Sequence, residues 1–363
     1  MKKKLLFTAY SMGLGGIETA LCNLLNRLDY DKYDVTLILE KKEGIFLDQI
    51  SKKVKVLEYR ISDDKNVLLR KIKNRLKLIK WKRKLKNQFD FSCCFATYSI
   101  PGAHLALAAS ENSHLWVHLN YYITYKENEE EMAKFFNGVM APKFRRVVFV
   151  SEENRREVCK HYPVIKDKAY VCNNFINGED VLEKANEECD YKKDKNTLFV
   201  NVGRHDEYQK RLTRIINSSK KLVDEGYKFK ILFIGDGEEH QMYEDLIKKL
   251  KLQDTILMLG KRKNPFPYYK MCDAVLLSSE FEGYPVVFLE AMTLDKPILS
   301  TQVSDWEGLD KKNGLFCERS EEGVYKMMKK FLDKGFDIKK KFDYKEYNLG
   351  IEKKIISFIN DDV

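Results

Sequence analysis

Two glutamates near residue 290 are the carboxylates whose setting best suits ligand binding. Glu282 follows an apolar run at residues 273–277 that is long enough for a buried strand, and Glu290 lies in a predicted helix that starts near Pro285. Gly283 allows a tight turn and lets a ligand approach the backbone closely. Because five helical residues rise only about 7.5 Å, both carboxylates can face one ligand. Carboxylates that bind hydroxyls, beside free N–H groups for phosphate at the helix start, suit a nucleotide-sugar, although the spacing alone favours two ordinary surface glutamates.

The residues around this pair are more specific than its spacing, which ordinary surface glutamates would also explain. Glu-Phe-Glu-Gly-Tyr-Pro-Val-Val-Phe-Leu-Glu-Ala-Met at 280–292, with Lys-Pro-Ile-Leu-Ser-Thr after it, closely resembles the signature of retaining GT-B glycosyltransferases of the group 1, family 4 type. That family includes sucrose synthase and bacterial capsule, lipopolysaccharide and teichoic-acid transferases. The resemblance implies that Glu282 contacts the donor sugar and that Glu290 holds the ribose hydroxyls. Asp295 departs from it, since the family usually has glycine before Lys-Pro.

Two cations follow the first predicted strand of the second half of the chain. Arg204 and Lys210 lie in Gly-Arg-His-Asp-Glu-Tyr-Gln-Lys, and both can reach a diphosphate, arginine with two N–H groups and lysine as a point charge. Exposed cations are usually only solvated, but the spacing resembles the family's Arg/Lys pair on the departing diphosphate. His205 has no matching role in the family, so we expect it to be a surface residue.

The resemblance implies further ligand contacts in both halves of the chain. Gly15 and Gly16 match the Gly-Gly-x-Glu turn that faces the donor diphosphate, and His118, near the end of a short apolar strand, matches a histidine that contacts the donor sugar. A lone histidine is more often structural. The backbone after Gly260 contacts the nucleobase in relatives. The predicted catalytic residues are His118, Arg204, Lys210 and Glu282; the predicted donor-binding residues are Gly15, Gly16, Arg204, Lys210, Lys261, Arg262, Glu282, Gly283, Tyr284, Pro285, Val286 and Glu290; weaker candidates for the acceptor cleft are Asn120, Tyr121 and Tyr122.

Strand-like and helix-like segments alternate through both halves of the 363 residues, which predicts an α/β protein with two doubly wound parallel sheets. The resemblance implies the GT-B arrangement, with two Rossmann-like domains facing across a cleft. We expect an N-terminal acceptor-side domain at 1–177, a charged linker at 178–196 and a C-terminal nucleotide-sugar-binding domain at 197–342. A C-terminal helix at 343–363 should cross back to the first domain, as in GT-B proteins.

The net charge of +10 comes from one segment, because residues 65–86 hold eleven lysines and arginines and no acidic residue, which leaves 10 − 11 = −1 elsewhere. Leu69, Ile72, Leu76 and Ile79 recur there at helical spacing. A basic amphipathic helix can lie on an anionic membrane, although a solvated helix packed on the core fits equally well. We expect no nucleic-acid partner.

The eight cysteines form no Cys-x-x-Cys pair and have no histidines at zinc spacing, which predicts a reduced, cytoplasmic protein without a metal. The N-terminus resembles the start of a signal peptide, but glycines and Glu18 interrupt it, so a first strand is the better interpretation. We expect the protein to be cytoplasmic, and residues 65–86 are the segment that would hold it at the inner face of the plasma membrane if the basic helix binds lipid rather than packing as a solvated helix.

The resemblance implies a retaining glycosyltransferase of cell-surface polysaccharide synthesis. It would move a sugar from a nucleoside diphosphate, more often UDP than GDP, to a hydroxyl of a lipid-linked or polymeric glycan without any cofactor. A sugar-nucleotide epimerase or a phosphorylase of the same fold, and a non-catalytic binder of anionic polymers, are the alternatives. A binder would not need the cation pair and the glutamate pair together.

Overall fold

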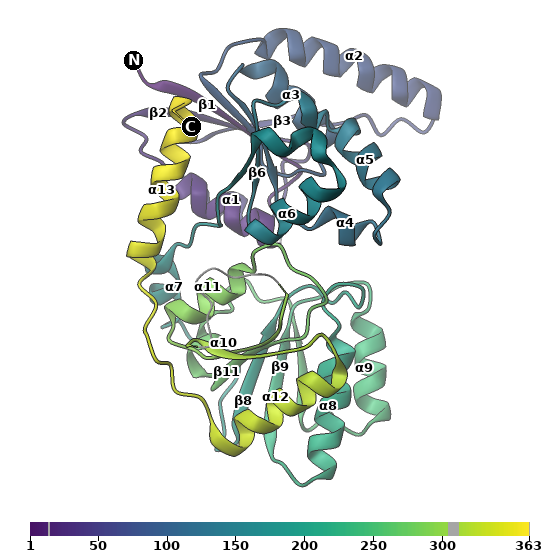
Figure 1. Cartoon of the computed structure of the whole chain (residues 1–363), viewed down its shortest axis with the longest axis vertical. Coiled ribbons are helices and arrows are strands. Elements are labelled where there is room, and N and C mark those ends of the chain that lie inside the picture. The colour runs from purple at the N-terminus through teal and green to yellow at the C-terminus, as the bar shows by residue number, and fades with distance from the viewer. Residues whose placement is uncertain (14, 304–311, 363) are drawn as a thin grey trace. The chain divides into compact units, whose positions relative to one another are not determined.

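The computed structural model describes residues 1–13, 15–303 and 312–362, which form two compact α/β units (Figure 1). The first unit comprises Met1–Phe175 and Asn348–Val363, and the second comprises Ile176–Tyr347. Each unit is organised around one parallel sheet, as the alternation of strands and helices in the sequence predicts. This is the architecture of the two halves of a GT-B protein.

The sheet of the first unit has seven strands within the described residues, in the order β3-β2-β1-β4-β5-β6-β7. Neighbouring strands pair in parallel, and Leu5 of β1 is aligned with Val35 of β2 and Phe91 of β4. Most of its strands are buried on both faces, which explains why their sequences are continuous apolar runs. The strands are β1 (Lys3–Ala9), β2 (Tyr33–Leu39), β3 (Lys55–Glu58), β4 (Phe91–Cys94), β5 (Ser113–Val117), β6 (Arg146–Phe149) and β7 (Ala169–Val171).

The helices of the first unit begin where polar side chains can cap them. Ser99, Asn120 and Ser151 each accept a hydrogen bond from a backbone N–H group in the first turn of the helix that follows, which satisfies a donor that has no intrahelical partner. The helices are α1 (Gly16–Arg27), α2 (Val67–Leu85), α3 (Ile100–Ala109), α4 (Tyr121–Thr124), α5 (Glu129–Gly138) and α6 (Glu152–His161).

The sheet of the second unit has six strands within the described residues, in the order β10-β9-β8-β11-β12-β13, again all parallel. Its core contains buried side chains from Phe199 on β8, Phe233 on β9 and Leu276 on β11. The strands are β8 (Thr197–Val202), β9 (Phe229–Ile234), β10 (Ile256–Gly260), β11 (Ala274–Leu277), β12 (Ile298–Thr301) and β13 (Gly314–Cys317). The helices are α7 (Gly178–Lys184), α8 (Leu212–Asp224), α9 (His240–Lys249), α10 (Phe266–Met271), α11 (Val286–Thr293) and α12 (Glu321–Lys334).

The segment expected as a linker, 178–196, is instead part of the second unit and opens with α7. Asn177 caps this helix, and the charges that suggested a linker are used in ion pairs. Asp190 binds Arg262 at 2.6 Å, and Lys193 binds Asp273 at 2.6 Å. A charged composition therefore marks a surface segment fixed by long-range pairing.

The C-terminal helix α13 (Tyr344–Asn360) contributes residues from 348 onwards to the first unit. There, Asn112 donates to the carbonyl of Phe358 at 2.8 Å, and the buried Arg146 lies 2.5 Å from the carboxylate of Asp361. These contacts fix the end of the chain against strands β5 and β6.

Candidate active site at the carboxyl edge of the second sheet

The second sheet has a switch point between β8 and β11. The chain places β9 and β10 on one side of β8 and then returns to the other side with β11. Ligands of open parallel sheets bind at such a point, outside the carboxyl ends of the strands. Residues 203–211 follow β8 and residues 278–285 follow β11, and these two loops contain Arg204, Lys210 and Glu282.

Hydrogen bonds tie the two loops together. The backbone N–H of Glu280 donates to the carbonyl of Gln209 at 2.7 Å, and the Ser278 hydroxyl lies 3.0 Å from the carbonyl of Lys210. Arg214, on α8, donates to the carbonyl of Ser278 at 3.1 Å. Arg204, Lys210 and Glu282 therefore stand on two loops that hydrogen bonds hold together.

Glu282 is buried at the centre of a polar network. The Lys210 ammonium lies 2.6 Å from one carboxylate oxygen, to which the Ser279 hydroxyl also donates at 2.7 Å. Gln209 donates to the other oxygen at 3.3 Å, and its own amide oxygen accepts a bond from Arg204 at 3.0 Å. The Arg204 side chain is 64% exposed, so its guanidinium is accessible to an anionic ligand. The structure thus brings together the two predicted cations and the first predicted glutamate.

The start of α11 lies directly after Glu282. Pro285 occupies the N-cap position and no side chain caps the helix, so the first N–H groups are suited to a phosphate. Gly283 and Val286 are buried, and the buried Tyr284 has its hydroxyl 2.9 Å from that of Tyr347. The predicted donor-binding turn is therefore firmly packed.

Glu290 lies further along α11 and is 7% exposed. Burial raises its pKa to about 7, and the hydroxyl of the neighbouring Tyr269 lowers it only in part. A carboxyl group that titrates near neutrality can both donate and accept hydrogen bonds, which suits it to paired hydroxyls such as those of a ribose.

The two basic residues after β10 have partners within the second unit. Lys261 lies 3.1 Å from Asp236 with its side chain 64% exposed. Arg262 donates to Asp190 at 2.6 Å and to the Tyr268 hydroxyl at 3.1 Å. The Arg262 side chain therefore links the loop after β10 to Asp190, near the start of the second unit.

His205 is fully buried, so the prediction of a surface residue is wrong. The glycine turn after β9 packs backbone to backbone against it. A Cβ atom on Gly235 would stand 1.8 Å from the carbonyl oxygen of Gly203, and one on Gly237 would stand 2.0 Å from that of His205. Only glycine permits this approach, and it is visible only once β8 and β9 are adjacent.

In the first unit, His118 directly follows β5 and is 5% exposed. Burial lowers its pKa to about 3, so the imidazole is neutral at physiological pH. Its Nε2 atom has no hydrogen-bond partner among the described residues. A buried ring nitrogen without a partner fits a sugar hydroxyl as its ligand.

The predicted glycine turn of the first unit leads into α1, which begins at Gly16 with Gly15 as its N-cap. The Glu18 carboxylate reaches back over this turn and accepts a bond from the Tyr98 hydroxyl at 2.9 Å. The N-cap backbone is extended and no side chain caps the helix, so its N–H groups suit a phosphate, as at α11.

The three weaker acceptor candidates have mainly structural contacts. Asn120 caps α4, and Tyr121 is buried with its ring stacked 4.5 Å from that of Phe135. Tyr122 stacks 3.7 Å from the imidazole of His161. Packing within the first unit accounts for all three.

Sequence reasoning missed the supporting side chains. Gln209 and Ser279 stand between motif residues, where their polarity alone is uninformative, yet both bind Glu282. In the first unit, Glu40 follows β2 and is buried, which raises the pKa of its carboxyl group, and Ser99 donates to it. An acidic residue directly after an apolar strand was the available signal for Glu40.

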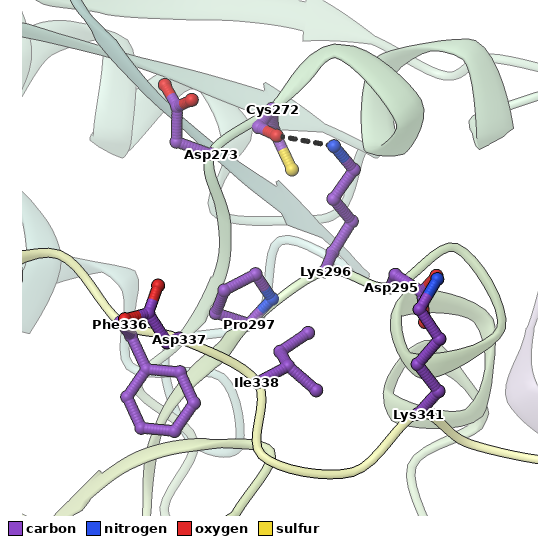
Figure 2. Close-up of a pocket in the computed structure, with 9 residues that line it drawn as sticks. All are labelled: Cys272, Asp273, Asp295, Lys296, Pro297, Phe336, Asp337, Ile338 and Lys341. Atoms are coloured by element: carbon purple, nitrogen blue, oxygen red, sulfur yellow. Dashed lines mark hydrogen bonds and ion pairs between the residues drawn. The ribbon is translucent and has the colours of Figure 1, made fainter.

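A cavity of about 330 Å³ lies at the opposite edge of the second sheet (Figure 2). Its lining includes Cys272 and Asp273, just before β11, and Lys296, just before β12. Lys296 donates to the carbonyl of Cys272 at 3.0 Å, as Figure 2 shows. The cavity is thus at the amino ends of the strands, away from the edge where parallel sheets bind their ligands.

Comparison with known families gives a match for each half of the chain. Residues 183–348 match the family described as Glycosyl transferases group 1, and residues 14–180 match Glycosyltransferase Family 4.

Among individual proteins, an uncharacterized glycosyltransferase of Methanocaldococcus jannaschii is 31% identical over 193 residues, and the match covers 52% of this chain and 47% of that protein, about half its length. The N-acetylgalactosamine-N,N'-diacetylbacillosaminyl-diphospho-undecaprenol 4-alpha-N-acetylgalactosaminyltransferase of Campylobacter jejuni is 25% identical over 309 residues, or 82% of this chain and 80% of that protein. The crystal structure of Anabaena HepE in complex with UDP and glucose superposes with a TM-score of 0.73 at 16% identity and covers 98% of this chain and 100% of that one. This last likeness shows the shared fold.

Proposed function

Because this chain belongs to the group 1, family 4 type of glycosyltransferases with the GT-B fold, we propose that it transfers a sugar from a nucleoside diphosphate to an acceptor hydroxyl with retention of configuration. The observation that carries this proposal is the network of Arg204, Lys210 and Glu282 at the switch point of the second sheet. It unites cations for a leaving group with a carboxylate for a sugar at the edge where such ligands bind.

In the proposed reaction, the bond between the anomeric carbon and the diphosphate breaks while the acceptor oxygen bonds to the same face of that carbon. The acceptor proton passes to the leaving diphosphate. Arg204, Lys210 and the first N–H groups of α11 stabilise the negative charge that grows on the diphosphate, which is a preorganised electrostatic contribution. These groups supply the positive charge themselves, so the proposed reaction uses no metal cofactor.

Within the second unit, Glu282 takes the sugar in this proposal. Glu282 accepts hydrogen bonds from sugar hydroxyls, and Glu290 binds the ribose. His118, neutral because burial lowers its pKa to about 3, exchanges a hydrogen bond with a sugar hydroxyl and does not act as a general acid.

We propose UDP as the donor nucleotide because HepE, which shares the fold, was crystallised with it. A lipid-linked or polymeric glycan of the cell surface is the proposed acceptor, and the Campylobacter relative, whose name gives a diphospho-undecaprenol substrate, supports this choice. The test is to incubate the protein with UDP-sugars and such acceptors and to follow UDP release and the glycan product. Glu282→Ala should abolish transfer while nucleotide binding survives, and wild-type turnover in that variant would remove its assigned role.

The proposed partner of α2 is an anionic membrane. Within the described residues no helix has both the length and the apolar character that a bilayer crossing requires. The helix α2, at the periphery of the first unit (Figure 1), packs on the core through Leu78, Trp81 and Leu85. At about 100° per residue, the middle of this packed set lies about 130° around the helix from the middle of Leu68 and Ile72, which are 67% and 48% exposed.

The outer face of α2 therefore carries an apolar stripe that the core does not use. We use the name outer stripe for Leu68, Leu69, Ile72, Leu76 and Ile79, all of which are exposed. On a helical wheel this set spans about 100°. Lysines and arginines border it on both sides, namely Lys71, Arg75 and Lys82 on one and Arg70, Lys73, Lys77, Lys80 and Lys84 on the other.

An apolar stripe between two basic borders suits the interface of an anionic bilayer, where apolar side chains enter the acyl boundary and long basic side chains reach the headgroups. We therefore propose that the protein acts in the cytoplasm at the inner face of the plasma membrane, where a lipid-linked acceptor would be presented to it.

A further inference from the structure

Three metal-ligating side chains meet beside Arg204 in the second unit, and the proposed transfer reaction does not use them. They are His205 in the loop after β8, Asp236 in the turn after β9, and His240 at the start of α9. One ligand atom from each lies within 4.8 Å of the other two. The His205 and His240 Nδ1 atoms are 2.9 Å apart, and His240 Nδ1 is 3.5 Å from Asp236 Oδ1.

The backbone fixes this cluster in place. The N–H of His205 donates to the carbonyl of Asp236 at 3.0 Å, and the N–H of Gly203 donates to that of Ile234 at 3.0 Å. Gly235 and Gly237 permit the close approach, because a Cβ atom on either would stand 2.0 Å or less from a carbonyl oxygen of the first loop. Two of the three ligands, His205 and Asp236, therefore stand on loops that backbone hydrogen bonds hold together, and the third stands at the start of α9.

Neutral imidazoles can share the proton between the two Nδ1 atoms in two ways. If His205 Nδ1 carries the shared proton, the lone pair of His240 Nδ1 also faces the Asp236 carboxylate at 3.5 Å. If His240 Nδ1 carries it, the unprotonated His240 Nε2 faces the Glu244 carboxylate at 3.3 Å. The second arrangement opposes two acceptors. The first leaves His240 Nδ1, which already accepts from His205, beside a carboxylate that Lys261 and the N–H of Gly237 also bind. A cation among the three ligand atoms would take both Nδ1 lone pairs and leave His240 Nε2–H to donate to Glu244.

We propose that His205, Asp236 and His240 bind one divalent transition-metal ion, Zn²⁺ in the first place. Two imidazoles and one carboxylate are a ligand set that this ion accepts, with bonds of about 2.0–2.2 Å and a fourth position left to water. Tetrahedral ligand atoms at that distance stand about 3.3 Å apart, between the 2.9 Å and 3.5 Å that separate His240 Nδ1 from His205 Nδ1 and Asp236 Oδ1. The third separation, between the His205 and Asp236 ligand atoms, is within 4.8 Å. Glu244 orients His240 through its other ring nitrogen, as carboxylates do for metal-bound histidines.

The ion would lock the loop after β8 to the turn after β9 and so hold Arg204, the neighbour of His205, at the switch point. The metal ion takes no part in the proposed transfer reaction. The sequence does not predict it, because its histidines are 35 positions apart and meet only in the folded sheet.

The test uses the full-length protein, freed of metal, and titrates it with ZnCl₂ by calorimetry and by thermal melting. We expect one equivalent to bind with a rise in Tm, since binding to the folded state alone stabilises it. His240→Ala, which changes a partly exposed residue, and Asp236→Asn should abolish both signals. Glu244→Gln should weaken binding by about tenfold.

Two controls separate the site from general zinc binding. His161→Ala removes a histidine that lies 2.6 Å from Glu129 in the first unit, and it should leave the titration unchanged. Lys261→Met removes the cation that competes for Asp236, and it should tighten binding. No rise in Tm for the wild-type protein, or a rise that persists in both His240→Ala and Asp236→Asn, would overturn the proposal and would leave a hydrogen bond between His205 and His240 as the contact.

Discussion

The ammonium of Lys210 lies 2.6 Å from the carboxylate of Glu282, with only 18% and 7% of the two side chains exposed. The cation proposed for the diphosphate and the carboxylate proposed for the sugar thus neutralise each other when no donor is bound. Bringing two charges out of water is costly, so neither tolerates the loss of its partner well. This pair links the stability of the second unit to its proposed activity.

Single substitutions in this pair should destabilise the protein more than the double substitution does. Lys210→Met and Glu282→Gln each leave a largely buried polar or charged group without its partner, and Lys210→Met should cost about 3 kcal/mol. In the double variant no charge remains unpaired, so we expect a favourable coupling of at least about 1 kcal/mol. Urea unfolding of the four proteins measures the cycle. Strictly additive losses would contradict a coupled pair.

Glu290 should make the free energy of unfolding fall as the pH rises towards neutrality. Burial raises its pKa from 4.5 to about 7, so between these values the folded state binds more protons than the unfolded state. The stabilisation is therefore complete below pH 4.5 and is lost as the pH rises through 7, and its full size is about 3 kcal/mol.

Glu290→Gln should remove this component of the pH dependence between pH 4.5 and 7.5. Glu238→Gln, which changes an exposed carboxylate of the same unit, is the matched control. Chemical denaturation across that range measures the effect, and identical slopes for Glu290→Gln and the wild-type protein would contradict it.

The ion pair between Arg262 and Asp190 should contribute to the stability of the second unit rather than to ligand binding. Both side chains are partly exposed, at 29% and 58%, so Arg262→Ala and Asp190→Ala should each cost no more than about 1 kcal/mol. If relatives contact the base through the backbone after Gly260, both variants should keep their affinity for UDP within about threefold. A tenfold loss confined to Arg262→Ala would assign its side chain to the nucleobase instead.

The outer stripe of α2 should govern binding to anionic vesicles. Leu69→Ser, Ile72→Ser and Leu76→Ser together should abolish co-sedimentation with phosphatidylglycerol vesicles and leave Tm nearly unchanged, because these side chains are exposed. Replacing the bordering lysines by glutamine should weaken binding by about 1 kcal/mol per residue at low salt.

A matched control for the stripe is the set Val164→Ser, Leu182→Ser and Leu349→Ser, which changes exposed apolar residues elsewhere. It should bind vesicles like the wild-type protein. Unchanged binding after loss of the stripe would leave α2 as a solvated helix packed on the core.

The fold was predictable because each strand of a doubly covered parallel sheet is a short apolar run, such as 274–277, followed by a turn and an amphipathic helix. The positions of Glu282 and Arg204 at strand ends followed from the same pattern. The side chains with which they pair could not be predicted from this pattern. Lys210 and Glu282 are 72 positions apart, and the burial of His205 depends on glycines that follow another strand. Local sequence specifies the elements, while contacts between distant loops decide which polar side chains are buried together.

The same limit explains the error at the expected linker. Residues 178–196 are rich in charge, which locally favours a solvated segment, but Asp190 and Lys193 find partners in Arg262 and Asp273. A helix cap at Asn177 and long-range ion pairs were not visible in composition. Residues 67–85 do form a helix, as their apolar spacing predicts, and its basic side chains border an exposed apolar face.

The most direct test of the central claim is to titrate the purified protein with UDP, GDP and their common sugar conjugates and to follow Tm. We expect a rise in Tm with UDP that is lost in Arg204→Ala and in Glu290→Ala. Lys341→Ala, which changes an exposed cation at the cavity on the opposite edge of the sheet, should keep the rise. No rise with any nucleotide, or a rise that survives both site variants, would contradict a donor site at this edge and would favour a binder of anionic polymers.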